Sequence, residues 1–178
     1  SMAVEPLLHY DYSDYYQLPK ATGRDILTEP YFYEGIFMMS YDSPIIKDGK
    51  FVGIAGVDVS LEYVDKVASS IRAFDTGYAF MVSNTGVFLS HPTQKSWIGN
   101  KKLSDFGVKE INNAEADIRQ GIGGHIEVKD PITGKTVIMF YEPVKTGNFS
   151  FVLVVPKAEM LAGVTDLRDH LLVISAIS

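Results

Sequence analysis

The sequence predicts an α+β fold built from antiparallel sheets, and three features of the chain support this class. Short segments rich in β-branched and aromatic residues alternate with turns that contain glycine, proline or asparagine, a pattern typical of strands joined as hairpins. A polar stretch with helical periodicity is inserted among the strands, which separates the fold from an all-β one. One strand-turn-strand-helix unit also occurs twice, so two similar units are expected in tandem.

Composition sets limits on the function. With 178 residues, of which 46% are hydrophobic, the chain can bury a core as one domain or as two small ones. The net charge of −6 and the scattered basic residues exclude the electrostatic pattern of a nucleic-acid-binding protein. Cysteine is absent, which excludes disulfides and thiolate metal sites and leaves the cellular compartment open.

Residues 3–30 contain many turn formers and little periodicity, so we expect mostly loop with one short helix. The segment is nevertheless rich in tyrosine. Tyrosine side chains offer flat apolar faces and hydroxyl groups at low conformational cost, which suits the rim of a binding site. Covering the open side of a sheet is the other interpretation, and both remain open. The tyrosines are Tyr10, Tyr12, Tyr15 and Tyr16.

The next segment is expected to form an antiparallel hairpin. Residues 31–41 have the composition of a strand, with a break near Gly35 and an end before Ser43-Pro44, and Ile45-Ile46 carries it on into the turn. The turn at Asp48-Gly49 then leads into residues 51–59, which are rich in β-branched residues and are expected to form a buried strand.

Asp58 is the candidate recognition residue of this hairpin. It lies near the end of the second strand between apolar neighbours, where a carboxylate buried without a partner is costly. A helix is expected over residues 60–72 with Ser60 as its cap, and the positive end of its dipole is one partner for Asp58. A ligand with a cationic or donor-rich group is the other. The two roles are compatible, and we expect the ligand.

The second half of the chain is expected to form strands around one polar helix. Glycine-containing turns separate the strands, among them Asn84-Thr85-Gly86. The expected strands cover residues 78–83, 87–90, 125–129, 136–141 and 149–155, and the expected helices cover residues 103–106 and 108–119.

The internal repeat places the recognition residue in its first copy. Residues 41–58 contain a proline-bearing strand, a glycine turn and a second strand. Residues 141–156 repeat this order roughly a hundred residues later, before a helix that starts near Ala158. The first copy has Asp58 where the second has Pro156, so charged recognition is expected in the first copy. The second copy has its own preceding strands and helix, whereas the first is expected to lack its beginning.

The sequence contains no catalytic or metal-binding pattern. The four histidines are scattered without ligand spacing, and neither a nucleophile elbow nor a phosphate-binding loop occurs. We therefore expect no enzymatic activity and no cofactor.

Several segments of the chain carry a family resemblance in combination. They are Tyr15-Tyr16 before Pro19, residues 29–33, Ser43-Pro44-Ile45, residues 51–61, residues 77–86 and Ser90-His91-Pro92. Together they resemble the double Cache family over nearly the whole chain. The resemblance implies two PAS-like modules on a long N-terminal helix, followed by a transmembrane helix, in an extracytoplasmic sensor of a prokaryotic histidine kinase or chemoreceptor. It also implies homodimers and a first module truncated at its N-terminus.

The resemblance also implies a ligand site in the membrane-distal module. In ligand-binding members of the family, an Asp at the end of the last strand binds an amine group next to aromatic residues. Asp58 matches that Asp by position. The chain departs from the amino-acid-binding version at Ser13 in place of Arg, Tyr15 in place of Trp, and Tyr33 in place of an acidic residue. These departures argue against an α-amino acid and leave an amine, a different small metabolite, or no small ligand at all. The expected ligand-binding residues are Tyr15, Tyr16, Tyr31, Tyr33 and Asp58.

The resemblance divides the chain into three parts. Residues 3–74 would be the C-terminal part of the membrane-distal module, and residues 75–157 the membrane-proximal module. Residues 158–178 would form a helix leading toward a membrane span. Within it, the apolar residues 171–178 are either the outer edge of that span or the end of a packed helix.

Two functions fit the sequence. The first is an extracytoplasmic sensing module, in which a small polar or cationic ligand shifts the C-terminal helix. The second is a structural, dimerisation or protein-interaction module with no small-molecule ligand. The missing beginning of the first module and Pro156 favour the second function. Asp58 and the tyrosines favour the first, which we expect.

Overall fold

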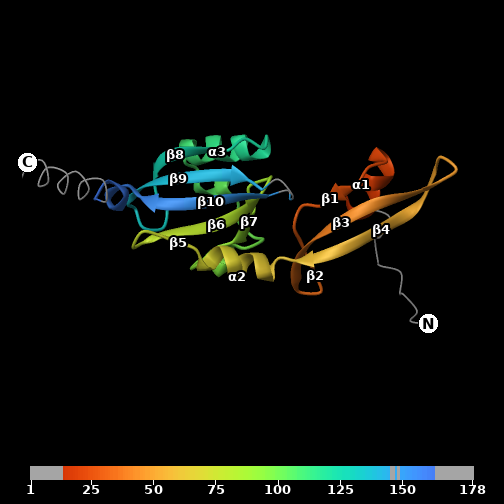
Figure 1. The fold of residues 1–178 in the computed structure, drawn as a ribbon, viewed down its shortest axis with the longest axis horizontal. Helices are drawn as coiled ribbons and strands as arrows, with labels where there is room; N and C mark the ends of the chain where they lie inside the picture. Colours follow the sequence, from red (N-terminus) through yellow and green to blue (C-terminus); the bar gives the residue numbers. More distant parts are fainter. Residues whose placement is uncertain (1–13, 145–146, 148, 163–178) are drawn as a thin grey trace, which may run out of the picture. The chain divides into compact units, whose positions relative to one another are not determined.

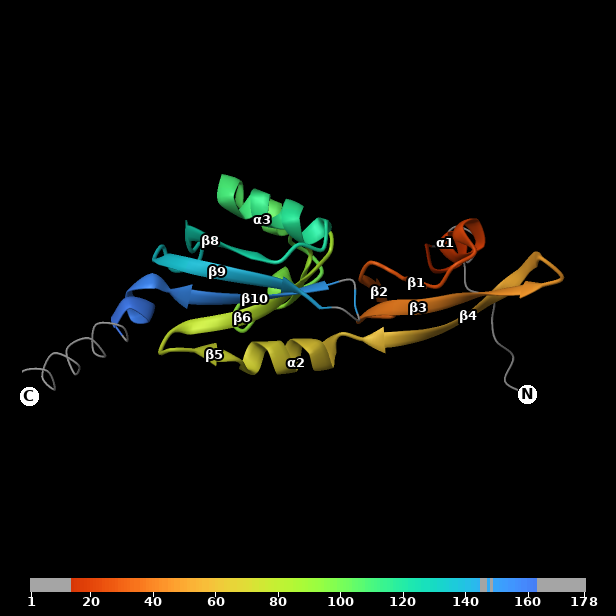
Figure 2. The same ribbon diagram turned by 45° about the horizontal axis from the view of Figure 1, so that its top comes forward.

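The computed structural model describes residues 14–144, 147 and 149–162 of the chain. Helices and antiparallel sheets alternate in these residues, which confirms the mixed α and β class (Figures 1 and 2). The chain divides into two compact units between Leu61 and Glu62. The helix that begins at Glu62 thus belongs to the second unit. The module boundary predicted between residues 74 and 75 stays a prediction.

The first unit is a four-stranded antiparallel sheet with one helix packed against it. Its longest strand, β3, pairs with β4 along one side and with both β1 and β2 along the other. The predicted hairpin around the turn at Asp48-Gly49 is therefore confirmed. The elements are α1 (Asp14–Thr22), β1 (Ile26–Leu27), β2 (Tyr31–Tyr33), β3 (Ile36–Lys47) and β4 (Lys50–Ser60).

Two details of β2 and β3 correct the sequence prediction. The break near Gly35 is a tight turn that reverses the chain from β2 into β3, and Glu34 and Gly35 both have positive φ, 49° and 80°. β3 also continues through Pro44 instead of ending before Ser43. Proline is tolerated there because β1 stops pairing at Asp42, so the next residues of β3 have a partner strand on one side only within the described chain.

β4 is more exposed than its composition predicts. None of its residues is buried, so the expectation of a buried strand is wrong. The reason lies in the sheet order, because β3 is the sole pairing partner of β4 among the described residues. β4 is thus an edge strand, and its β-branched residues reflect sheet propensity rather than burial.

The second unit contains a six-stranded antiparallel sheet in the order β5-β6-β10-β9-β8, with β7 also paired to β6. α3 covers one face of this sheet and α2 lies against the other at β6 (Figure 2). The strands and helices predicted for this half are confirmed within one or two residues at most ends. The elements are α2 (Glu62–Ser70), β5 (Arg72–Ala73), β6 (Gly77–Ser83), β7 (Phe88–Ser90), η2 (Lys95–Trp97), η3 (Leu103–Phe106), α3 (Lys109–Arg119), β8 (Gly124–Lys129), β9 (Thr136–Pro143) and β10 (Phe149–Pro156).

Aromatic rings fill one end of the core between the sheet and the loops. Phe88 is 1% exposed, and its ring centroid lies 5.1 Å from that of Phe80 and 5.3 Å from that of Trp97. The ring of His91 is also buried, 5.9 Å from Phe88. Its Nδ1 accepts hydrogen bonds from the backbone N–H groups that follow it, so the proton of the neutral ring is on Nε2.

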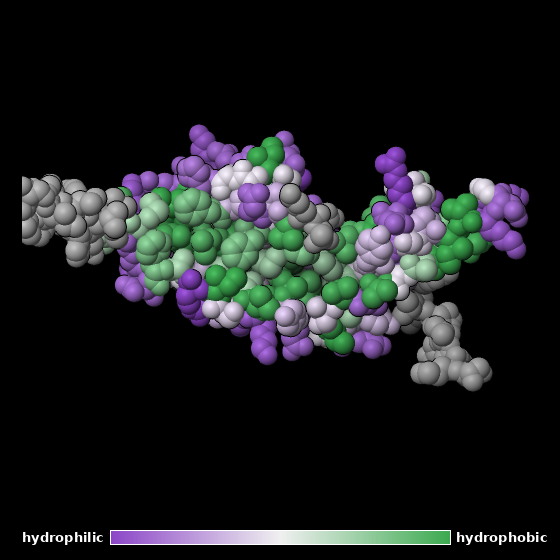
Figure 3. All heavy atoms as spheres, in the orientation of Figure 1, coloured by the Kyte–Doolittle hydropathy of each residue, from purple (hydrophilic) through white to green (hydrophobic). Residues whose placement is uncertain are grey.

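On the face of the sheet opposite α3, apolar side chains remain partly exposed. Figure 3 shows hydrophobic residues gathered over β6, β9 and β10. Phe140 is 39% exposed, and Phe151 and Leu153 are half-buried. Because successive side chains of a strand point to opposite faces, these strands leave one apolar side of the sheet partly open to solvent.

The helix expected near Ala158 is present over residues 157–162, and two polar contacts hold its start. Lys157 forms an ion pair with Glu127 of β8 at 2.8 Å. On the other side, Glu159 accepts the backbone N–H groups of Asp75 and Thr76, both at 3.0 Å, and the Thr76 hydroxyl. The Thr76 hydroxyl bond and these backbone bonds favour the ionised carboxylate and lower the pKa of Glu159.

The described residues end at Ala162. The rest of the predicted C-terminal helix, including the apolar residues 171–178, therefore lies outside them. In the part of the chain that the structure describes, no helix has both the length and the apolar character needed to span a bilayer.

Candidate functional site

The candidate site lies on one face of the β3–β4 hairpin. Ser40 pairs with Asp58 and Asp42 pairs with Gly56, so these residues alternate onto the same face of the sheet. β2 adds Tyr31, which pairs with Met38, also on this face. We call this the inner face.

Three side chains of the inner face form one hydrogen-bonded group. The hydroxyl of Ser40 donates to Oδ1 of Asp58 and is itself hydrogen-bonded to the hydroxyl of Tyr31. Tyr31 also donates to Oδ1 of Asp58 over 3.4 Å. Burial and, to a lesser extent, the charge of Asp58 raise the pKa of Tyr31, so its hydroxyl keeps its proton as a donor.

The backbone fixes the position of Ser40. Its N–H donates to Oγ1 of Thr28 at 2.9 Å, and its carbonyl accepts the N–H of Thr28 at 2.9 Å. Both residues are buried, 2% and 3% exposed. The hydroxyl that contacts Asp58 thus belongs to a strand with fixed backbone contacts. Asp58 itself is exposed, which corrects the burial expected from its apolar neighbours, because β4 is an edge strand.

The structure brings two of the predicted site residues together, Tyr31 and Asp58. Tyr16 lies on α1, and its ring packs at 5.5 Å against Phe51. Phe51 precedes Asp58 by seven residues of β4, which is about 23 Å at about 3.3 Å per residue. Tyr15 is half-buried on the same helix.

Tyr33 ends β2 and is 41% exposed. The resemblance-based roles of Tyr15, Tyr16 and Tyr33 stay predictions, and Ser13 lies outside the described residues.

Ser40 and Asp42 also belong to this face, although neither was among the residues predicted from the sequence. Asp42 is 3% exposed, and its Oδ2 has no hydrogen-bond partner in the described chain. Burial, and then the charge of Asp58, raise the pKa of Asp42 to about 6. The signal available in the sequence was the Ser40-x-Asp42 spacing, which puts both residues on the face that also carries Asp58 if the hairpin register is known.

Gly56 makes room for the carboxylate of Asp42. A Cβ atom at Gly56 would lie 2.0 Å from Oδ1 of Asp42 and 3.2 Å from the carbonyl oxygen of Tyr41. The Asp42 side chain therefore lies across the β4 backbone at this position. Glycine at this position of the strand allows the close approach.

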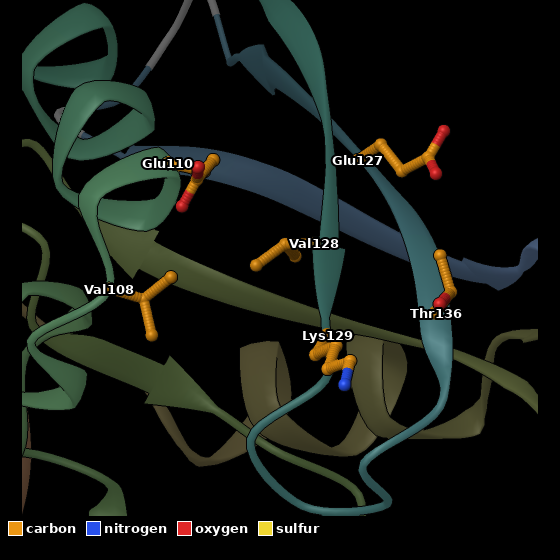
Figure 4. A pocket seen from close by; sticks show the side chains of 6 residues that line it. All are labelled: Val108, Glu110, Glu127, Val128, Lys129 and Thr136. Carbon is orange, nitrogen blue, oxygen red and sulfur yellow. The ribbon is translucent and has the colours of Figure 1, made fainter.

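Two hollows among the described residues lie in the second unit, and neither is lined by Tyr31 or Asp58. The first holds about 20 Å³ among the aromatic rings, room for a single water molecule. The second, of about 400 Å³, is open and lies between the start of α3 and β8 (Figure 4). There Val108 and Val128 face each other, and Glu127 is already paired with Lys157. The described residues include no group of three or more side chains suited to a metal ion.

Comparison with known proteins places these observations in a family. The Cache domain family matches residues 2–164 of the chain. The solved extracellular domain of mmHK1S-Z2, a protein named as a histidine kinase, is 83% identical with a TM-score of 0.84, over 88% of this chain and 60% of that domain.

Chemoreceptors are more distant relatives. Methyl-accepting chemotaxis protein PscA of Pseudomonas syringae pv. tomato is 28% identical over 157 residues, 86% of this chain and 24% of PscA. The ligand-binding domain of the amino acid chemoreceptor PctB of Pseudomonas aeruginosa, solved with L-Arg, is 26% identical with a TM-score of 0.66, over 96% of this chain and 65% of that domain. The same domain has also been solved with L-Gln. The chain spans about a quarter of the length of the curated chemoreceptors it matches.

Proposed function

The chain belongs to the Cache domain family, and from this premise we propose that it is the extracytoplasmic ligand-sensing domain of a transmembrane receptor, either a sensor histidine kinase or a chemoreceptor. Its relatives support the proposal, since they include an extracellular domain named for a histidine kinase and ligand-binding domains of chemoreceptors. The two units would be tandem modules, the first distal and the second proximal to the membrane, in a homodimer.

The ligand is proposed to be small and polar or cationic. This proposal rests on the groups that surround the carboxylate of Asp58. Its carboxylate is oriented by the hydroxyls of Ser40 and Tyr31, yet no lysine or arginine pairs with it among the described residues. An oriented acceptor without a counter-charge suits an ammonium group. Ligand binding then acts on the C-terminal helix only through a difference in affinity between two states of the domain.

Asp58→Ala is expected to abolish the rise in melting temperature that the cognate ligand produces, while the unliganded domain keeps its fold. Loss of the carboxylate removes the charged acceptor and leaves the hairpin ladder unchanged. The measurement is a thermal-shift screen of amines, amino acids and related metabolites on the 178-residue chain and the variant.

Asp48→Asn is the control for this experiment. It removes a carboxylate from the exposed turn of the same hairpin, at a positive φ of 51° that asparagine accepts. Its ligand response should equal that of the unchanged chain. A variant Asp58→Ala that still responds fully would take Asp58 out of the site.

The alternative function, a dimerisation or protein-interaction module, is favoured by a different surface. On the face of the hairpin opposite Asp58, Tyr41 is 49% exposed, Val57 65% and Val59 46%. If this surface is the functional one, Val57→Lys should shift the sedimentation coefficient toward a monomer, and no metabolite should raise the melting temperature.

A further inference from the structure

Asp42 has a carboxylate that the fold buries without satisfying. The residue is 3% exposed, and Oδ2 has no hydrogen-bond partner within the described residues. A buried charged group usually has a partner, because leaving it unpaired costs more than a lost hydrogen bond between neutral groups. Gly56 also keeps the space that this side chain fills, since any Cβ there would lie 2.0 Å from Oδ1.

Asp42 and Asp58 are diagonal neighbours on the inner face. Asp42 pairs with Gly56 and Ser40 pairs with Asp58, which sets the two aspartates about 7–8 Å apart at the backbone. Carboxylates at this separation can both reach one ammonium group placed between them. No ion pair involves either aspartate in the described chain. Lys20, on α1, instead lies over the ring of Tyr16, 5.5 Å from its centroid.

We propose that Asp42 is a second ligand-binding carboxylate of the site and that the ligand is a small primary amine without an adjacent carboxylate group. The inference rests on the proposed sensing function and specifies its ligand class. One ammonium group has three N–H donors, enough for Asp42 and Asp58 together. An α-amino acid would bring a third carboxylate to the same place, and like charges at close range repel.

The test compares amines with the amino acids that differ from them by one carboxylate. The pairs are 3-methylbutylamine with L-leucine, agmatine with L-arginine, and 1,5-diaminopentane with L-lysine, measured by titration calorimetry on the 178-residue chain. We expect at least one amine to bind about tenfold or more tightly than its amino acid partner. A single charged hydrogen bond supports a difference of this size.

Two variants test the role of Asp42. Asp42→Asn keeps the shape and removes the charge, and Gly56→Ala keeps the charge and displaces the carboxylate. Both should weaken the amine about tenfold or more. Asp48→Asn, which removes the same charge from the turn of the hairpin, should bind as the unchanged chain does. Circular dichroism and the melting curve establish whether each variant is folded. If Asp42→Asn does not fold, the amine affinity of Gly56→Ala tests the role of Asp42.

The outcomes separate this inference from the proposed function. Amino acids that bind as tightly as their amines, or binding that needs Asp58 but survives both variants at Asp42 and Gly56, would overturn the role of Asp42 and leave the sensing function standing. If neither series binds at millimolar concentration, both the amine class and the small-ligand sensor are overturned.

Discussion

Phe88→Ala is expected to lower the free energy of unfolding of the second unit by about 3–5 kcal/mol, the range for removing a fully buried aromatic side chain. Phe88 is 1% exposed, and four rings surround it. Its truncation leaves a cavity that the β7 backbone cannot close, because the Phe88 N–H donates to Lys101 and its carbonyl accepts from Gly99. Chemical denaturation followed by tryptophan fluorescence measures the loss, since the single Trp97 lies 5.3 Å from the ring.

Phe140→Ala is the matched control for this loss. The same side chain is removed from β9, but this ring is 39% exposed on the face of the sheet opposite α3, and its centroid lies 5.8 Å from that of His125. We expect the free energy of unfolding to fall by about 1 kcal/mol, because a partly exposed side chain loses less buried contact when it is truncated. Equal losses in the two variants would show that the ring cluster around Phe88 is not the main core contact of this unit.

Stability of the second unit should fall as the pH drops from 6.5 toward 4, because His91 is buried in its neutral form. Burial lowers the pKa of His91 to about 4, with Lys95 acting in the same direction and Asp130 and Asp65 opposing it. A group whose folded pKa lies below its unfolded value binds its proton mainly in the unfolded state, so acid favours unfolding. This pKa shift corresponds to a loss of at most about 3 kcal/mol in the free energy of unfolding, and with solvent screening we expect a loss of about 2 kcal/mol.

His91→Asn removes this titration while its side-chain oxygen can still accept the backbone N–H groups that Nδ1 accepts. The variant should be less stable at pH 7 and should lose less stability between pH 6.5 and 5 than the unchanged chain. His125→Asn, on an exposed position of β8, should keep the pH dependence. A steep loss that persists in His91→Asn would assign the acid sensitivity to other groups.

Elements defined by local patterns were predictable from the sequence. The β3–β4 hairpin follows from Asp48-Gly49, whose two residues both adopt positive φ as the turn requires. The strands of the second unit follow from β-branched and aromatic segments separated by turn residues, and α3 from the spacing of Ile111 and Ile118, both buried in the core.

The site was predictable only in part, because it depends on strand register. Asp58 and Tyr31 were identified, but the group that holds them includes Ser40, whose role follows from pairing with Asp58 across the sheet. The turn at Gly35 decides this arrangement, since it folds β2 back beside β3, and a break in a strand pattern does not reveal a reversal. The position of Tyr16 against Phe51 likewise depends on how α1 packs, a long-range contact without a local signal.

The contacts at Lys157 and Glu159 have a mechanical consequence. Turning the helix about its axis would break the bond to Glu127 on one side and the bonds to residues 75 and 76 on the other. The start of the helix is therefore coupled to the β5–β6 corner on one side and to β8 on the other, so a displacement of either would move it.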